Sequence, residues 1–272
     1  DVHVASGILS KESEATVYHP VKDLYGIPYR CLYSVNVNNL FLAGRAISVT
    51  HMAFGSTRVM GTCAVVGQAV GTAAAMAVDK KLLSCSELED SVSELQQELL
   101  KDGCFIPGIQ NEDNADLAKK ARVAATSFKK EGKPQNVVNG AVRNRRGVCN
   151  AYISDGIGPS GERLSLTWDN PIDANCLLIR FDTNFRYELT ITLSDAIRRR
   201  QRPFPPELVK DYDAEFYLGG KLLKKIQIRD NIQRCNDLHL ERLTFDRADI
   251  VMYGTHGASD VSVFEVRVYN KD

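Results

Sequence analysis

The stretch Asn39-Leu-Phe-Leu-Ala-Gly-Arg-Ala-Ile-Ser48 decides the interpretation of the first part of the chain. Its apolar run, residues 39–43, predicts a short buried strand that ends at Gly44. A glycine directly after a strand lets the main chain turn sharply and approach a bound group closely. The stretch therefore predicts a strand that delivers backbone to a site.

A polar loop and a helix of small residues are expected to follow this strand. The loop holds His51 and the turn Gly55-Ser56-Thr57, and the segment Arg58–Val78 is rich in Gly and Ala, with no charge after Arg58. The N-terminus of such a helix offers unpaired N–H groups and the positive end of the helix dipole. Strand, glycine, loop and helix together favour contact with a cofactor.

Four motifs in this region occur in a specific order: Ile27-Pro28-Tyr29-Arg30, Asn39–Arg45, Gly55–Met60 and Gly67–Ala74. They resemble the C-terminal end of FAD-dependent oxidoreductases of the glutathione-reductase-like class. More narrowly, they are similar to a bacterial subfamily in which this flavin segment is followed by a β-sandwich. The resemblance covers residues 20–110 well and the rest of the chain more loosely.

The resemblance implies that the helix start points at the pyrimidine edge of the flavin, where backbone N–H groups would stabilise negative charge on the reduced ring. The strand end would meet the ribityl and diphosphate part of FAD. The cofactor-binding residues implied are Gly44, Arg45, Gly55, Ser56, Thr57, Val59 and Met60. A tight turn that binds no ligand is the alternative.

Two residues of the motif have side chains suited to catalysis. His51 is its only histidine and has the chemistry of a general acid or base, although a structural hydrogen bond explains it equally well. Arg58 could pair with a substrate carboxylate or the flavin, or cap a neighbouring carbonyl. By the resemblance, Tyr25 and Tyr29 could line the substrate side, although packing is the favoured interpretation.

The twenty uncharged residues Val59–Val78 also require a test for a membrane span. The spacing Gly67-x-x-x-Gly71 would suit a transmembrane dimer. Three Gly, two Thr and a Gln, with no aromatic belt, favour instead a buried helix laid closely against a sheet. No membrane partner is therefore predicted.

Leu82–Gly103 predicts an amphipathic helix, with Ser86 and Glu89 as a capping box and Asp102-Gly103 as the stop. Its apolar stripe consists of Leu88, Val92, Leu95 and Leu99. A polar linker, residues 111–116, follows. The expected organisation is residues 1–81 as the C-terminal portion of an FAD-binding domain, 82–120 as helix and linker, and 121–272 as a β-sandwich.

After Arg122 the apolar period becomes twofold, which indicates half-buried strands. Alternating runs occur at 164–168, 187–193, 212–218 and 264–268, and a phase slip near Glu241-Arg242 suggests a bulge. These runs predict an antiparallel, jelly-roll-like β-sandwich. Their order with residues 125–127, 136–140 and 152–155 is similar to discoidin-like, galactose-binding-like domains, although Tyr152 replaces the usual Trp.

The pattern Gly156-Ile157-Gly158-Pro159-Ser160-Gly161 matches a dinucleotide fingerprint only superficially, because a strand-like run follows it instead of a helix. It is interpreted as a loop of the sandwich. FAD-dependent oxidoreductases of the resembling class bind the FAD diphosphate through an N-terminal βαβ unit, which this sequence lacks. The chain begins at Asp1, and it is expected to be a fragment that binds FAD poorly or not at all by itself. Its expected partner is the missing N-terminal FAD-binding segment.

Composition excludes several classes. Lys+Arg and Asp+Glu number 34 each, so no overall charge favours nucleic acid. Seven cysteines without C-x-x-C predict neither a disulfide framework nor a zinc site, and the scattered histidines predict no metal. Basic residues at 143–146 and 198–202 are interpreted as solvated loop tips, with a sugar-acid or phosphate site as the alternative. Cytoplasmic and periplasmic locations both remain open.

The function predicted is hydride transfer from an unidentified small-molecule or carbohydrate substrate to FAD, by the complete oxidoreductase of which this chain is a part. The alternative is a carbohydrate-binding or interaction module of a polysaccharide-processing protein. Similar sequences are sometimes labelled xanthan lyases, but the sequence contains no lyase constellation. A structural role for the sandwich is a third possibility.

Overall fold

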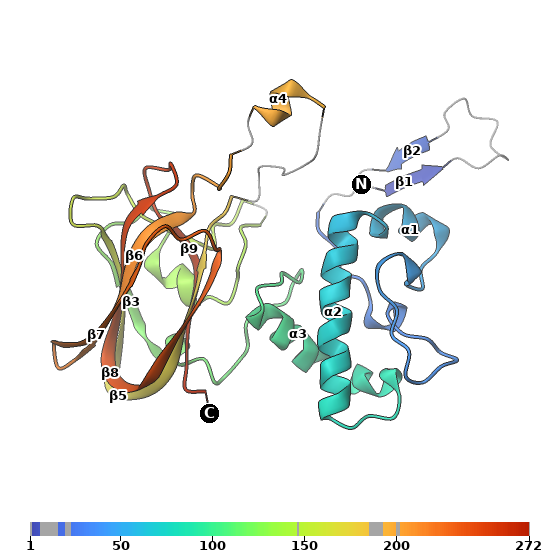
Figure 1. The fold of residues 1–272 in the computed structure, drawn as a ribbon, viewed down its shortest axis with the longest axis horizontal. Coiled ribbons are helices and arrows are strands. Elements are labelled where there is room, and N and C mark those ends of the chain that lie inside the picture. Colours follow the sequence, from blue (N-terminus) through green and yellow to red (C-terminus); the bar gives the residue numbers. More distant parts are fainter. Residues whose placement is uncertain are drawn as a thin grey trace. The chain divides into compact units, whose positions relative to one another are not determined.

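The computed structural model describes residues 2–5, 16–19, 23–145, 147–184, 193–199 and 202–271. The chain forms two compact units, residues 1–110 and 111–272 (Figure 1). Each unit contains its own hydrophobic clusters.

Helices dominate the described part of the first unit. Its elements are β1 (Val2–Ala5), β2 (Thr16–His19), 3₁₀ turns at Tyr29–Cys31 and Gly44–Ala46, α1 (His51–Thr57), α2 (Met60–Asp79), a 3₁₀ segment at Cys85–Ser91 and α3 (Val92–Lys101). β1 and β2 pair antiparallel. The predicted α/β fragment is therefore a mainly helical unit with one small two-stranded sheet.

The strand expected at residues 39–43 does not form. Within this run only Phe41 makes a β-bridge, to Tyr33, and Gly44 then starts a 3₁₀ turn with φ +61°. A strand needs neighbouring strands to satisfy its backbone, and the described residues of this unit offer this run only the bridge to Tyr33. The prediction of a strand at this position was wrong for this chain.

The turn expected at Gly55-Ser56-Thr57 is also wrong, because these residues form the last turn of α1. Thr50 caps this helix, and its hydroxyl oxygen accepts a hydrogen bond from the Ala53 N–H at 3.3 Å. The small-residue helix then begins at Met60, after the N-cap residue Val59. Two consecutive helices thus replace the expected loop and single helix.

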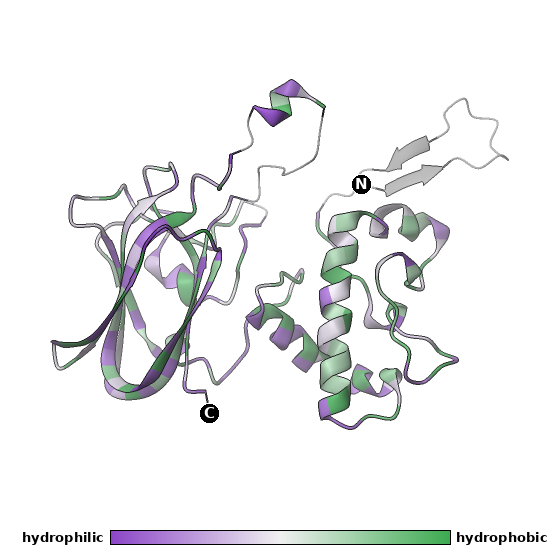
Figure 2. Ribbon diagram, in the orientation of Figure 1, coloured by the Kyte–Doolittle hydropathy of each residue, from purple (hydrophilic) through white to green (hydrophobic). Residues whose placement is uncertain are grey.

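Helix α2 packs along one side only. Val66 and Ala73 are buried, against clusters that include Leu32, Ile47 and Leu88. The opposite side remains exposed, with Met60 86% and Val78 76% accessible. By length and hydropathy α2 is also the one described helix that could cross a membrane, and 11% of its apolar window is buried. In Figure 2 most residues of α2 have the colours of apolar side chains.

The amphipathic helix is shorter than expected. It begins at Val92 rather than Leu82, because residues 85–91 form the 3₁₀ segment, whose start is capped by the Ser84 hydroxyl instead of Ser86. Leu95 and Leu99 are buried as predicted, and Asp102 is the C-cap residue.

The second unit is built from antiparallel strands. Its elements are a 3₁₀ turn at Leu117–Lys120, β3 (Arg122–Ala125), a 3₁₀ turn at Pro134–Val138, β4 (Tyr152–Ile153), β5 (Glu162–Phe181), α4 (Asp195–Arg198), β6 (Val209–Leu218), β7 (Lys221–Ile228), β8 (Cys235–Thr255) and β9 (Ser262–Tyr269). The strand order is β4-β9-β5-β8-β6-β7, and β3 pairs with β5.

The long strands β5 and β8 take part in two layers. Their pairing shifts register between Thr167 and Ile172. Before this shift β5 has β3 on its other side, and after it β5 has β9. We call the layer of β3, β6, β7 and the adjoining halves of β5 and β8 the β6 layer, and the layer of β4, β9 and the other halves the β9 layer.

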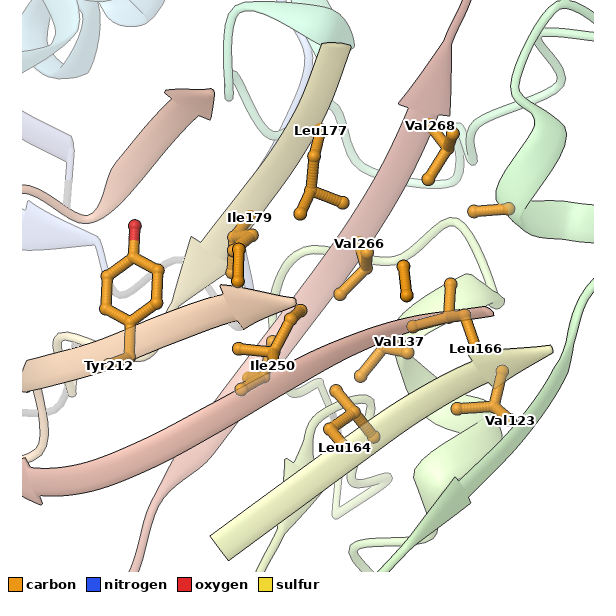
Figure 3. Close-up of a cluster of buried hydrophobic side chains, with 14 of the residues drawn as sticks. Val123, Val137, Leu164, Leu166, Leu177, Ile179, Tyr212, Ile250, Val266 and Val268 are labelled. Carbon is orange, nitrogen blue, oxygen red and sulfur yellow. The ribbon is translucent and has the colours of Figure 1, made fainter. Parts of the chain in front are cut away.

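Side chains from both layers form a single core. Leu164 and Leu166 from the β6 layer face Ile179, Val266 and neighbouring residues of the β9 layer (Figure 3). These side chains come from alternate strand positions, as the twofold period predicts. The prediction of an α/β fragment followed by an antiparallel, jelly-roll-like β-sandwich is confirmed.

The runs at 164–168, 212–218 and 264–268 are strands, as predicted. The bulge expected near Glu241-Arg242 is confirmed by a register shift between the pairs Ala174–Leu243 and Cys176–His239. The predicted run 187–193 lies outside the described residues except for Leu193. The Gly156–Gly161 pattern forms the loop between β4 and β5, as predicted.

The boundary between the units lies at Gln110–Asn111, ten residues before the expected start of the sandwich. The reason is a set of hydrogen bonds that tie the polar segment 111–117 to the sandwich. The Asn111 N–H donates to Gly140 O at 3.1 Å, and the Trp168 indole donates to Leu117 O at 2.9 Å. The expected linker is therefore part of the second unit.

Candidate functional site

The predicted cofactor-binding residues gather where α1 ends and α2 begins. Gly55, Ser56 and Thr57 are buried in the last turn of α1. The Thr57 carbonyl accepts a weak hydrogen bond from the Cys63 thiol, 3.6 Å away on α2. This contact holds the start of α2 against the end of α1.

Thr57 also has a buried polar atom without a partner. Its side chain is 4% exposed, and Oγ1 forms no hydrogen bond with the described residues. A buried hydroxyl without a partner costs free energy, typically about 1–3 kcal/mol. Unpaired buried groups of this kind require an explanation, and the described residues offer this hydroxyl no partner.

The N-terminus of α2 is open. Its N-cap residue is Val59, which offers no side-chain acceptor, and the following Met60 is strongly exposed. The first N–H groups of this helix have no side-chain cap and carry the positive end of the helix dipole. Uncapped amides at the start of a helix can stabilise an anionic or electron-rich group.

Gly44 and Arg45 lie in the 3₁₀ turn that packs against α1 and α2. The positive φ of Gly44 explains why glycine is suited to this position, and a Cβ placed there would lie 4.0 Å from the Cys63 Cβ. The Arg45 guanidinium lies 5.7 Å from the centre of the Phe54 ring. Arg45 is thus directed to a cation–π contact on α1.

The two candidate catalytic residues lie at opposite ends of α1. His51 is its first residue and Arg58 is its C-cap, and both are exposed. Among the described residues, no hydrogen bond or ion pair joins the side chains of His51 and Arg58 to each other or to the Thr57 hydroxyl. Their catalytic roles therefore stay predictions.

Tyr25 is part of the junction and Tyr29 is not. The Tyr25 and Ser56 hydroxyls are 2.5 Å apart, which ties residues before the motif to α1. Tyr29 donates to Cys85 O at 2.7 Å and packs against Phe41, and burial raises the pKa of its phenol. Packing explains Tyr29, whereas Tyr25 lines the candidate site.

Sequence reasoning missed two features of this site. The first is the Thr50 cap, whose signal was a threonine directly before a helix-forming run. The second is the unpaired Thr57 hydroxyl, which no local pattern reveals because it depends on tertiary burial. A third omission lies in the second unit, where charged residues at outward positions of β5, β6 and β8 form a connected cluster.

The described residues contain no group of three or more metal-ligating side chains placed to hold an ion. All seven cysteines are free thiols.

Comparison with protein families gives one match. The sequence model of the FAD dependent oxidoreductase family matches residues 1–99. This range includes α1, α2 and the junction between them, and it supports the part of the resemblance that concerns flavin-dependent oxidoreductases. No curated protein matches the chain.

Solved structures similar to the chain include three sugar-binding modules. A fucose binding module from Streptococcus pneumoniae has 13% identity and a TM-score of 0.43, over 58% of this chain and 98% of its own. The lectin domain of lectinolysin complexed with Lewis B antigen has 9% identity and a TM-score of 0.43, over 59% and 99%. The family 32 module of NanJ from C. perfringens, in complex with galactose, has 11% identity and a TM-score of 0.38, over 56% and 94%. Similarity at this level assigns no ligand and no binding site to this chain.

Proposed function

We propose that this chain is the C-terminal portion of an FAD-dependent oxidoreductase that transfers hydride from a small-molecule or carbohydrate substrate to flavin. The observation that carries this proposal is the uncapped N-terminus of α2, which begins three residues after Thr57. The family match over residues 1–99 supports it independently.

The junction fits the ring end of FAD rather than its phosphates. The amides at Val59 and Met60 can hydrogen-bond to a heteroaromatic edge, and the helix dipole favours negative charge there. Bound FAD would supply the hydride acceptor. His51 and Arg58 would bind or orient the substrate from the two ends of α1. The Gly156–Gly161 loop is followed by a strand, so it does not supply the diphosphate site.

The exposed side of α2, opposite the buried residues Val66 and Ala73, supports the proposal that a further part of the protein packs against this unit. Met60, Ala64, Gly67, Gly71 and Val78 recur at helical spacing on that side, and none is charged. A helix that is apolar all round is normally buried. We propose that the sheet of the remaining flavin-binding domain covers this side, and that the small residues allow close approach.

The test uses the complete protein that contains this chain and measures FAD released on denaturation. Gly71→Lys should abolish bound FAD, because the lysine would separate the helix from the sheet. The matched control is Ser93→Lys, at an exposed position of α3, which should retain FAD. A Cβ at Gly71 meets no atom within 4 Å in this chain, so the 272-residue chain should remain equally stable with either substitution.

Two results would overturn the proposal. One is a complete protein that contains no flavin and shows no flavin absorbance when FAD is added. The other is flotation of the 272-residue chain with lipid vesicles that Gly71→Lys abolishes, since this would assign the uncovered side of α2 to a membrane.

A further inference from the structure

The outer face of the β6 layer carries three buried carboxylates. Asp213, Glu215 and Asp249 are each at most 8% exposed, although they point away from the hydrophobic core. Asp213 and Glu215 lie on β6, and Asp249 lies opposite Glu215 on β8. Buried charges require partners, since desolvation is otherwise costly.

Four cations supply these partners. The contacts are Lys225 with Asp213 (2.7 Å) and Glu215 (3.1 Å), Arg229 with Asp213 (2.8 Å), Arg163 with Glu215 (3.0 Å) and Asp249 (2.5 Å), and Arg247 with Asp249 (3.4 Å). The side chains of these cations are 34–44% exposed. Solvent therefore meets a layer of cations, and the carboxylates lie beneath it.

Two tyrosines complete the face. Tyr253 donates to Asp213 and Tyr217 donates to Glu215, both at 2.7 Å. Tyr253 is 40% exposed, and the Arg229 guanidinium lies 5.3 Å from the centre of its ring. Each hydroxyl is thus fixed by a carboxylate, so the rings are held in place before any ligand binds.

Arg247 is the residue of this face that is best placed to bind a ligand. Its guanidinium is stacked 4.0 Å from the centre of the Tyr217 ring, and only Nε approaches Asp249. Both terminal nitrogens have no protein partner within the described part of the chain. A stacked guanidinium with free terminal N–H groups is suited to a carboxylate, which it can bind through two parallel hydrogen bonds.

We propose that this face binds an acidic oligosaccharide. Arg247 donates two hydrogen bonds to the carboxylate of a uronic acid, and the exposed ring of Tyr253 packs against a sugar ring further along the chain. Tyr253 lies six positions after Arg247 on β8, which is roughly 20 Å at strand spacing. The ligand is therefore an oligomer rather than a single sugar.

Strand pairing favours a saccharide over an acidic peptide. An extended peptide gains affinity by hydrogen-bonding to the backbone of an exposed sheet edge. On this face the backbones of β6 and β8 are paired on both sides with other strands. Side-chain donors and aromatic rings remain available, and these are sufficient for a sugar chain. This inference does not depend on the proposed flavin chemistry of the first unit.

The experiment is calorimetric titration of the full 272-residue chain with an oligogalacturonate about 20 Å or more in length. We expect the chain to bind the oligomer with an affinity that falls as salt is added. Arg247→Gln should lower this affinity by about tenfold or more, because it removes one charge-assisted pair of hydrogen bonds. The matched control is Arg242→Gln, an exposed arginine of β8 bonded to Asn270, which should bind like the wild type. Trp168 fluorescence verifies that both variants are folded.

Tyr253→Ala should weaken the binding of the oligomer. It should leave the binding of the galacturonic acid monomer, a weak ligand, unchanged. The inference is overturned if oligogalacturonate does not bind, or if Arg247→Gln and Arg242→Gln bind it equally. Equal affinity for a neutral oligogalactoside would exclude recognition of the carboxylate. Equal affinity for polyglutamate would assign the face to acidic peptides.

Discussion

The carboxylate of Asp116 accepts a hydrogen bond from the backbone N–H of Val268, 3.0 Å away and 152 residues later in the chain. The same oxygen accepts a hydrogen bond from the Ala118 backbone N–H at 3.0 Å. The other oxygen accepts one from the side-chain amide of Asn111 at 3.1 Å. Asp116 is buried. This one side chain therefore joins the beginning of the second unit to its last strand, β9.

Because of Asp116, the free energy of unfolding of the second unit should fall as pH rises from about 4 to about 6. Burial raises the pKa of Asp116 from 3.8 to about 6, although hydrogen bonds from Val268 and Ala118 act in the opposite direction. Between these values the unfolded chain is ionised and the folded chain is not, so folding becomes less favourable as pH rises. We expect Asp116→Asn, which keeps an acceptor oxygen, to gain stability relative to the wild type over this range.

The measurement is urea unfolding at several pH values, followed by the fluorescence of Trp168. This is the only tryptophan of the chain, and it lies in the second unit, so its emission reports the unfolding of that unit. Parallel pH profiles for the wild type and Asp116→Asn would contradict the prediction.

Asp213 produces the opposite dependence at lower pH. Burial alone would raise its pKa, but hydrogen bonds from Lys225, Tyr253 and Arg229 outweigh this effect and hold the pKa below 3.8. Its stabilising contribution is therefore present above about pH 4 and is lost as pH falls through the lower, folded-state pKa. We expect Asp213→Asn to cost about 1–3 kcal/mol at pH 7.

The difference in unfolding free energy between wild type and Asp213→Asn should shrink below about pH 4, as the wild-type carboxylate becomes protonated. Urea unfolding at pH 7 and pH 3 measures it. A difference that stays constant would show that hydrogen-bond geometry, rather than charge, determines the cost.

Position 140 requires glycine for two reasons, its backbone conformation and the atoms that lie next to it. Its φ is +79°, and a Cβ there would lie 2.8 Å from the Asn111 nitrogen, the atom that donates to Gly140 O. Gly156 has a similar φ of +90° but open space around a Cβ. Gly156→Ala should therefore cost only the left-handed backbone energy, about 1–2 kcal/mol, and Gly140→Ala should cost clearly more in urea unfolding. Equal costs would mean that the segment at Asn111 moves away freely.

The strands of the second unit could be predicted because each has one face in the core. The alternation at 164–168 and 212–218 depends only on which side of a strand is buried, and the sequence contains this information directly. The bulge near Glu241-Arg242 was predictable for the same reason, since a slip of one residue reverses the alternation. These strands can therefore be predicted without knowing which other strands they pair with.

The errors in the first unit have a different origin. The apolar run 39–43 has the composition of a strand, but a strand also needs neighbours, and local pattern does not supply them. The turn expected at Gly55–Thr57 followed from glycine and small polar residues, whereas the Thr50 cap and tertiary packing favour a helix. The cluster around Asp213 and Asp249 was missed because its members become neighbours only once β6 and β8 pair.

Asn136 cross-links three backbone segments of the second unit. Its side-chain amide nitrogen donates to the carbonyl oxygens of Glu131 (3.2 Å), Cys149 (3.3 Å) and Ala151 (2.8 Å). Asn136→Asp would place a carboxylate against three carbonyl oxygens, which repel it, whereas Asn136→Ala only removes the donor. We expect Asn136→Asp to be the less stable variant at pH 7, by about 1–3 kcal/mol.

A protonated carboxyl group can again donate one hydrogen bond, so lowering the pH should reduce this difference. Urea unfolding of the two variants at pH 7 and pH 4, followed by Trp168 fluorescence, makes the comparison directly. Since Asn136 and the three carbonyl groups all lie between residues 131 and 151, a smaller gap at low pH would locate the effect in this loop region. Equal stability of Asn136→Asp and Asn136→Ala at pH 7 would show that the carbonyl groups turn away and that the cross-link does not fix them.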